Sequence, residues 1–409
     1  MKTGKTYLVG GAVRDDLLGL QVSERDWVVV GSTADEMLDQ GFKQVGASFP
    51  VFLHPKNGEE YALARSEKKQ GHGYHGFKVN FHTNVTLEQD LQRRDLTINA
   101  IARDEDGNLI DPCGGLRDLK QKVLRHVSEA FVEDPLRVFR VARFAARFAP
   151  MGFHVHDSTL ALMREITQSG ELQHLAAERC WREIERAMQT GKPSEFVSVL
   201  RDCGALEVLL PEVNALFGIP QPEKYHPEID TGTHLLMALD IAAELSNGAA
   251  NIVFAVLLHD LGKGLTPQQK WPSHVGHEAA GLPLVDAVCS RLKAPNALHD
   301  LAHKVCASHL DCHRVLEARP ATVMRLLERL DVFRQPGVLP DFVMACEADY
   351  RGRKGLQDRP YPQGEYLQKA YRVAADISAR DLDLEGISGP AVGDRLRQAR
   401  VEAIAGLAK

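Results

Sequence analysis

The chain has 409 residues, enough for two or more domains that each bury a hydrophobic core. Its net charge of −6 and pI of about 6.3 exclude nucleic-acid binding through bulk basic charge and leave only a local basic patch. Seven cysteines without a CxxC pair indicate a reducing, cytoplasmic location and argue against a thiolate zinc site, and no apolar run is long enough to span a membrane.

Residues 1 to about 112 predict an α/β region in which apolar strand-like runs alternate with polar and glycine-rich segments. We expect strands at 6–10, 25–31, 50–54 and 59–65, and a short helix at 12–19. The basic, glycine-rich segment 66–77 predicts a mobile loop.

The first strand ends in Gly10 and Gly11, directly before the expected helix. Glycines let the backbone approach a ligand closely, and the N–H groups of a first helical turn attract anions. The turn therefore predicts a phosphate site, although a tight turn that merely uses glycine explains it as well.

Glu24 and Asp26 are two residues apart at the start of the second strand, so we expect both side chains on one face. Two carboxylates beside a phosphate-binding turn suit Mg²⁺, which could activate a hydroxyl and stabilise leaving pyrophosphate. An exposed polar strand edge is the plain alternative.

Two arginine-rich stretches follow. The segment 93–99 begins Arg-Arg-Asp, and arginine pairs well with triphosphate oxygens. Asp134 and Pro135 open a helix with a basic stripe, formed by Arg137, Arg140, Arg143 and Arg147. Because no acid inside this helix lies four residues from an arginine of the stripe, we expect the stripe to face an anion. A plain helix cap at Asp134 and surface charge are the alternatives.

From residue 134 the sequence predicts helices almost without a break, with a proline-rich boundary at 217–230. Nine of the 17 histidines then fall between His226 and His313. Imidazoles and carboxylates from separate helices are typical of a divalent metal site in a helical bundle. The HDLGKG string at 259–264 resembles that of the HD phosphohydrolases, and this resemblance implies the ligands His234, His259, Asp260 and a last aspartate, for which Asp349 is favoured over Asp331, with His277 and His309 as accessory ligands. His226, His299 and His303 are expected to be surface or packing residues.

These motifs, in this order, resemble those of the bacterial CCA-adding tRNA nucleotidyltransferases. The resemblance implies an α+β protein with a nucleotidyltransferase-type α/β head, an all-α neck and body, and an α-helical HD domain. We expect the head at 1–140, a helical nucleotide- and tRNA-binding region at 141–225, the HD domain at 226–335 and a helical tail at 336–409.

The resemblance also implies residue roles. Nucleotide contacts are expected from Gly11, Arg14, Arg94, Asp134, Arg137, Arg140 and Arg143. Asp134 and Arg137, together with Glu133, would read the base, because cytosine and adenine both offer an exocyclic amine to a carboxylate. Glu24 and Asp26 would hold Mg²⁺ as catalytic ligands, although the family normally has Asp at the first position. His259 and Asp260 would be catalytic in the HD site, whose four ligands would hold Ni²⁺ or Mg²⁺.

The implied function is template-independent addition of C, C and A to tRNA 3′ ends from CTP and ATP. The HD domain would add 2′,3′-cyclic phosphodiesterase, 2′-nucleotidase and phosphatase activity for tRNA repair. We expect a cytoplasmic monomer or homodimer with tRNA as partner and no membrane contact. The alternatives are a poly(A) polymerase, which often carries a basic C-terminal extension not seen here, a tRNA-binding chaperone with a decayed polymerase site, and an HD hydrolase of free nucleotides regulated by the head.

Overall fold

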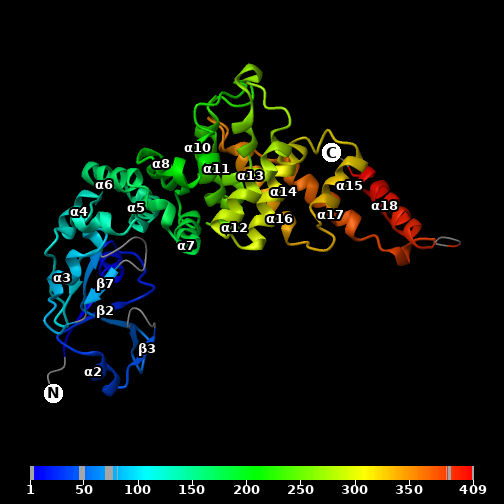
Figure 1. The fold of residues 1–409 in the computed structure, drawn as a ribbon. Helices are drawn as coiled ribbons and strands as arrows, with labels where there is room; N and C mark the ends of the chain where they lie inside the picture. Colours follow the sequence, from blue (N-terminus) through cyan, green and yellow to red (C-terminus); the bar gives the residue numbers. More distant parts are fainter. Residues whose placement is uncertain are drawn as a thin grey trace. The chain divides into compact units, whose positions relative to one another are not determined.

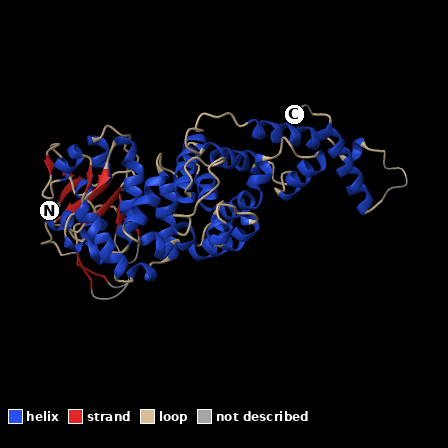
Figure 2. Cartoon of the chain, turned by 90° about the horizontal axis from the view of Figure 1, so that it is seen from above, coloured by secondary structure: helices blue, strands red, loops and turns tan. Residues whose placement is uncertain are grey.

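The computed structural model describes residues 4–45, 51–69, 77–80, 82–383, 385 and 388–407. The chain forms two compact units, Met1–Cys180 with Ser198–Leu209, and Trp181–Val197 with Leu210–Lys409. Among the described residues every strand lies in the first unit, and the second is built from helices (Figures 1 and 2). The expected α+β class, with an α/β head followed by a helical body, is therefore confirmed. No helix in these ranges is long and apolar enough to cross a membrane.

The head is built on a seven-stranded mixed sheet with the order β3-β4-β5-β2-β1-β8-β9. Its strands are β1 (Lys5–Val9), β2 (Asp26–Val30), β3 (Lys43–Val45), β4 (Val51–Leu53), β5 (Glu60–Leu63), β8 (Ala102–Arg103) and β9 (Leu109–Ile110). The four strands expected from the sequence are β1, β2, β4 and β5. Two strand pairs stand apart, β6 (Ser66–Lys69) with β7 (Phe77–Asn80), and β10 (Val123–Leu124) with β11 (His154–Val155).

The expected loop at 66–77 is wrong at its two ends. Ser66–Lys69 and Phe77–Asn80 pair as antiparallel strands. The hydrogen bonds of this pairing are made by the backbone, so the polar side-chain composition gave no sign of them. The rest of that loop, residues 70–76, lies outside the described residues.

The register of the sheet places the first glycine turn beside the acidic strand. β1 and β2 are antiparallel, and Val9, the last residue of β1, is opposite Asp26, the first of β2. The alternating side chains of β2 anchor this corner on both faces, since Val28 packs in one apolar cluster and Val29 in another. Helix α1 (Gly11–Leu17) then starts directly from Gly10, whose φ of +70° favours glycine.

The other helices of the head are α2 (Ala34–Asp39), α3 (Leu87–Gln92), α4 (Gly115–Gln121), α5 (Leu136–Phe148), α6 (Asp157–Gln168) and α9 (Ala205–Leu209). Two further helices, α7 (Ala177–Met188) and α8 (Pro193–Asp202), each contribute residues to both units. Helix α5 is buried along most of its length, including Arg137 and Arg143, so its basic stripe is far less solvated than a surface stripe.

The second unit contains α10 (Pro211–Asn214), α11 (Thr231–Ser246), α12 (Ala250–Leu258), α13 (His277–Leu292), α14 (Asn296–His313), α15 (Pro320–Arg329), α16 (Val338–Arg351), α17 (Pro362–Ala375) and α18 (Pro390–Ala405). Helix α12 is apolar around its circumference, and residues Ile252–Leu258 are all buried. It packs against α11, α14 and α16. The residues that follow it, His259 and Asp260, are therefore held at the centre of the bundle.

Candidate functional site

The acidic pair lies at a small cavity in the head. Asp26, Glu60, Arg65, Arg93 and Arg94 are among the residues that line this cavity of about 210 Å³. Crowding by protein atoms raises the pKa of the Asp26 carboxyl, the nearby Arg94 opposes this shift, and Glu24 adds to it. A carboxylate between a cation and a second carboxylate is a suitable ligand for a divalent ion.

Glu24 precedes the strand instead of opening it. β2 begins at Asp26, so the alternation of a strand determines the direction of Asp26 but not of Glu24. Both side chains are exposed. The expectation that Glu24 lies on the strand is thus wrong, and the common face of the two carboxylates stays a prediction, although the two charges are close enough to influence each other.

The arginines of the 93–95 segment are held by an aspartate that the sequence reasoning missed. Buried Asp90 pairs with Arg93 at 2.7 Å and with Arg94 at 3.2 Å. Burial alone would raise the pKa of Asp90, but Arg94 and Arg93 outweigh it and lower that pKa. The signal was present, because a carboxylate three and four residues ahead of two arginines on a helix reaches both. Arg94 also lies against Gly10, where a Cβ would come within 2.8 Å of its Nη1.

Arg14, expected to bind nucleotide, is only 3 % exposed. Its Nε donates to Asp15 Oδ1 at 2.8 Å, and its Nη1 donates to Asn99 Oδ1. The guanidinium carbon lies 5.1 and 5.0 Å from the centres of the Phe144 and Phe148 rings. The side chain therefore joins α1 to the 97–99 turn and to α5. Gly11 is the first residue of α1, the helix that this side chain anchors.

The arginine stripe of α5 has acidic partners after all. Arg140 Nε donates to Asp95 Oδ2 at 2.8 Å, and Arg147 pairs with Asp15 at the same distance. The expectation of an unpaired stripe is wrong because it considered only acids on the same helix, whereas both partners come from distant segments. Arg140 remains 34 % exposed, so part of its guanidinium can still reach a ligand.

Asp134 has two roles in the structure. Its Oδ1 accepts a 3.1 Å hydrogen bond from the Leu136 backbone N–H, as expected if Asp134 caps the helix. Its Oδ2 lies 3.5 Å from Arg179 Nη2. Arg137 is 9 % exposed and donates to the backbone carbonyls of Ala130 and Arg93 at 2.8 and 2.5 Å. Buried Arg143 places its guanidinium carbon 4.2 Å from the Phe144 ring centre, and Glu133, half-buried, ends the turn before Asp134.

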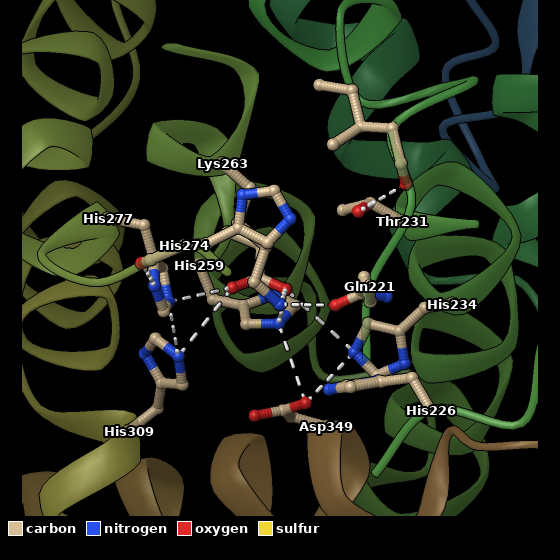
Figure 3. Close-up of polar contacts among 12 residues, drawn as sticks. Gln221, His226, Thr231, His234, His259, Lys263, His274, His277, His309 and Asp349 are labelled. Carbon is tan, nitrogen blue, oxygen red and sulfur yellow. Dashed lines mark hydrogen bonds and ion pairs between the residues drawn. The ribbon is translucent and has the colours of Figure 1, made fainter. Parts of the chain in front are cut away.

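In the second unit four buried imidazoles point their Nε2 atoms at two carboxylates (Figure 3). Each Nδ1 lies within hydrogen-bond distance of a backbone carbonyl oxygen. The pairs are His234 with Gly352 (3.0 Å), His259 with Val256 (2.7 Å), His277 with His274 (2.8 Å) and His309 with Val305 (3.1 Å). A carbonyl only accepts, so these contacts place the proton on Nδ1 and leave the Nε2 lone pair for a cation.

The two carboxylates link the four histidines into adjoining ligand groups. Asp349 Oδ1 lies 3.0 Å from His234 Nε2 and 3.6 Å from His259 Nε2. Asp260 places Oδ2 at 3.2 Å from His259 Nε2 and Oδ1 at 3.2 and 3.6 Å from His277 and His309. Residues 234, 259 and 349 form one possible metal-holding group and residues 260, 277 and 309 another.

The donor set fits a divalent ion. His259 Nε2 and Asp260 Oδ1 are buried and make no hydrogen bond, as expected of atoms that would face a cation. Burial alone would lower the pKa of His259, but Asp260 and Asp349 outweigh it and raise the pKa to about 10, so this position favours positive charge, carried by an Nε2 proton that a bound ion would replace. Burial would likewise raise the pKa of both carboxyls, yet the surrounding histidines hold them well below their ordinary range, with Lys263 contributing at Asp260.

The structure also separates the two candidates for the last ligand. Asp349, on α16, is 3 % exposed and lies in the cluster. Asp331 follows α15, pairs with Arg334 at 3.8 Å and belongs to none of the ligand groups that the described residues form. His299 pairs with exposed Asp286, as expected of a surface residue, and its ring lies 6.3 Å from that of His303.

His226 was expected to be a surface or packing residue, and its side chain is only 12 % exposed. Its Nδ1 lies 2.9 Å from Glu228 Oε1, which is itself 3.3 Å from His234 Nδ1, so His226 joins the edge of the cluster. His313, one of the nine clustered histidines, lies 2.7 Å from Asp349 Oδ2. The sequence reasoning missed Lys263, which pairs with Asp260 at 2.5 Å, although the i to i+3 spacing of these two residues could have indicated the pair.

Three family models match consecutive parts of the chain. Residues 6–125 match a poly A polymerase head domain, residues 152–217 a probable RNA and SrmB-binding site of polymerase A, and residues 231–333 an HD domain. The carboxylates and arginines of the head thus lie in or directly after the first match, and most of the histidine cluster lies in the third.

Comparison with whole proteins extends the similarity to nearly the full chain. The multifunctional CCA protein of Thioalkalivibrio sulfidiphilus is 60 % identical over 400 residues, and that of Vibrio campbellii is 54 % identical, each with 98 % of both chains covered. A CCA-adding enzyme solved with ATP is 20 % identical with a TM-score of 0.66, over 99 % of this chain and 88 % of that one. The Thermotoga maritima CCA-adding enzyme complexed with tRNA is 19 % identical with a TM-score of 0.60 at the same coverage. At such identities the two structures show a common fold.

Proposed function

The chain belongs to the multifunctional CCA proteins, and from this premise we propose how its residues perform two reactions. It is a CCA tRNA nucleotidyltransferase with an HD domain. We propose that the head adds C, C and A to the tRNA 3′ end from CTP and ATP, and that the histidine cluster removes phosphate from damaged ends. Both proposals are supported by the alignment of 98 % of this chain with a 60 % identical family member. The chain also carries two separate sets of residues suited to catalysis, the carboxylate and arginines of the head cavity and the histidine cluster.

In the head, Glu24 and Asp26 would hold Mg²⁺, which supplies charge stabilisation for the attacking hydroxyl and the leaving pyrophosphate. The backbone at Gly11, in the turn that Arg14 braces, would bind the triphosphate. Asp90 holds Arg94 at the cavity edge, where its guanidinium can pair with phosphate oxygens.

Base choice would lie at the start of α5. Asp134 would accept a hydrogen bond from the exocyclic amine that cytosine and adenine share. Arg137 would be fixed beside it by its hydrogen bonds to two backbone carbonyls. The partly exposed Arg140 and, after local rearrangement, Arg143 would provide further nucleotide contacts. The full-length match to CCA proteins supports this reading over a poly(A) polymerase, and the intact arginines support it over a decayed site.

In the HD domain, His234, His259, Asp260 and Asp349 would hold the divalent ion, with His277 and His309 as accessory ligands. Mixed imidazole and carboxylate ligands suit Ni²⁺ or Mg²⁺, and a bound ion supplies an activated water. Lys263 keeps Asp260 ionised and oriented. We propose 2′,3′-cyclic phosphodiesterase, 2′-nucleotidase and phosphatase activity for this site.

For the domains, we propose a head at 1–140, a nucleotide- and tRNA-binding region at 141–225, an HD domain at 226–335 and a helical tail at 336–409. We further propose that the protein acts in the cytoplasm as a monomer or homodimer, with the tRNA acceptor end as its partner.

One complementation experiment tests both reactions. A tRNA that ends in a 2′,3′-cyclic phosphate just before the CCA position is incubated with CTP, ATP and either Asp26→Ala, Asp260→Asn, or both variants mixed. Each variant alone should fail to restore CCA, and the mixture should succeed, because each supplies the reaction that the other lacks. Asp331→Asn, a similar change outside the cluster, is the control and should repair the end alone. Repair by Asp260→Asn alone would contradict the hydrolase assignment, and addition of CCA to a trimmed tRNA by Asp26→Ala would contradict the head assignment.

A further inference from the structure

A cavity of about 590 Å³ opens beside the histidine cluster, within the usual size range of small-molecule sites. Its wall includes Lys263, His277 and His313. The first two contact Asp260 and the third contacts Asp349, so anything bound in this cavity lies next to the two ligand carboxylates. The cavity is therefore the space available for the substrate of the cluster.

One wall of the cavity carries an exposed aromatic ring. Tyr225 precedes α11 and is 57 % exposed, which is high for so large a side chain. The Lys224 amine lies 5.2 Å from the ring centre, and the Tyr225 carbonyl accepts a 3.3 Å hydrogen bond from Arg353 Nη1. Val275, 98 % exposed, also lines the cavity. The ring is braced through its backbone and has Lys224 over one face, and its remaining exposed surface can stack against a flat ligand.

The inner wall offers polar atoms that have no partner among the described residues. Gln221 is 2 % exposed, and its Oε1 accepts from Lys263 Nζ at 2.6 Å while its Nε2 makes no hydrogen bond. Arg353 Nε and His274 Nδ1 are also buried without a partner. Buried donors and acceptors normally find partners, so these three atoms point to a polar ligand.

The charges on the wall favour a ligand with few negative charges. Lys263, Arg314 and Arg353 are offset in part by Glu278 and Glu317. Among the described residues Arg314 is exposed and forms no ion pair. A polyanion such as a triphosphate would be repelled by the two carboxylates here. The three cationic side chains suffice to balance the charge of a nucleoside with one phosphate.

We propose that this cavity receives the terminal nucleoside of the substrate, with its base stacked on Tyr225 and its phosphate directed at the histidine cluster. The unpartnered Gln221 amide and Arg353 Nε would bond to the ribose and phosphate oxygens. This assignment rests on the hydrolase function proposed above and adds a specificity determinant to it: the site selects nucleotides over phosphate esters that lack a base. Stacking on an aromatic side chain tolerates every base, as end repair of varied RNAs requires.

The test compares two substrates that differ only in the base, adenosine 2′-phosphate and 1-O-methylribose 2-phosphate. Released inorganic phosphate is measured for the wild-type chain and for Tyr225→Ala, Tyr225→Phe and Leu265→Ala. Leu265 is also 57 % exposed but does not line the cavity, so its variant is the matched control.

Tyr225→Ala should raise KM for adenosine 2′-phosphate at least about fivefold, the lower end for loss of one stacking contact, with kcat nearly unchanged. KM for the methylriboside should not move. Tyr225→Phe, which keeps the ring, and Leu265→Ala should behave as wild type. An equal rise of KM for both substrates, or none for either, would overturn the stacking assignment.

Failure of the hydrolase function itself would look different, because the wild-type chain would then release phosphate from neither substrate. Calorimetric binding of adenosine 2′-phosphate would still report on the cavity, since the head is identical in all four proteins and cancels in their differences. Weaker binding by Tyr225→Ala alone supports the proposal in that case, and equal binding by all four proteins overturns it.

Discussion

Replacing Arg14 by alanine tests whether this arginine holds the head together. The side chain is 3 % exposed, and it joins α1 to the 97–99 turn and to two phenylalanine rings of α5. Burial lowers the pKa of its guanidinium and Asp15 opposes that shift. Asp15 is shared with Arg147, so removal of Arg14 leaves a buried carboxylate with one cation instead of two.

The expected magnitude follows from these contacts. Removing one partner of a buried ion pair costs about 3–5 kcal/mol when the remaining charge has no other partner, and because Arg147 still faces Asp15 this range is the upper limit here. The Asn99 oxygen also loses its donor, and the Phe144 and Phe148 rings lose a cation, but these losses overlap with the first and are not added. In a unit of this size about 2–4 °C of melting temperature corresponds to each kcal/mol, so Arg14→Ala should melt lower by up to about 6–20 °C.

Differential scanning calorimetry of the full chain measures the effect on the head transition, with Arg117→Ala as the control. Arg117, also in the head, is 63 % exposed and 3.6 Å from Asp118, so its loss should change stability by about 0.5 kcal/mol at most. Arg14→Lys, which keeps the charge but not the forked geometry, should fall between the two. If Arg14→Ala melts within about 2 °C of wild type, the buried network is not a source of stability and the reasoning fails.

Three further outcomes are expected. Glu24→Asp should retain or raise the rate of CTP addition, and a fall to the level of Glu24→Ala would show that the backbone before β2 is adapted to Glu. Asp134→Ala should weaken discrimination against UTP more than it raises KM for CTP, and loss of its helix-capping bond should lower stability by about 1 kcal/mol. Unchanged selectivity would mean that Asp134 only caps the helix. Burial alone would raise the pKa of Asp95, but Arg140 and bonds from Asn99 and the Leu96 amide hold it below its ordinary value. The stabilisation by Asp95 is thus complete above about pH 5 and lost as the pH falls below about 4, and melting curves of Asp95→Asn should lack that loss.

The sequence predicted what depends on short spacings. The adjacent His259 and Asp260, placed after an apolar run, indicated the centre of a helical metal site, and apolar runs indicated four of the seven strands of the sheet. What it could not predict were the partners that folding brings from far away. Asp95 is 45 residues from Arg140, so a search for acids on the same helix could not find it. The burial of Arg14 likewise depends on α5, more than 100 residues later in the chain.

The histidine cluster combines both kinds of feature, those set by short sequence spacings and those that depend on distant segments. The rings of His259, His277 and His309 are oriented by carbonyls three or four residues earlier, so a single turn of backbone sets each of them. His234 is different, because its Nδ1 partner is the Gly352 carbonyl at the end of α16, the helix that also carries Asp349.

The contact between α11 and α16 therefore completes the site in two ways at once, by orienting His234 and by supplying the second carboxylate. Gly352 permits this contact, since a Cβ there would overlap the backbone of Ala238 on α11. Three of the four imidazoles can thus be oriented within their own helical turns, while the fourth, and the carboxylate it faces, depend on the close packing of two helices more than 100 residues apart in the chain. Metal affinity at this cluster is in this way coupled to the correct packing of the whole bundle.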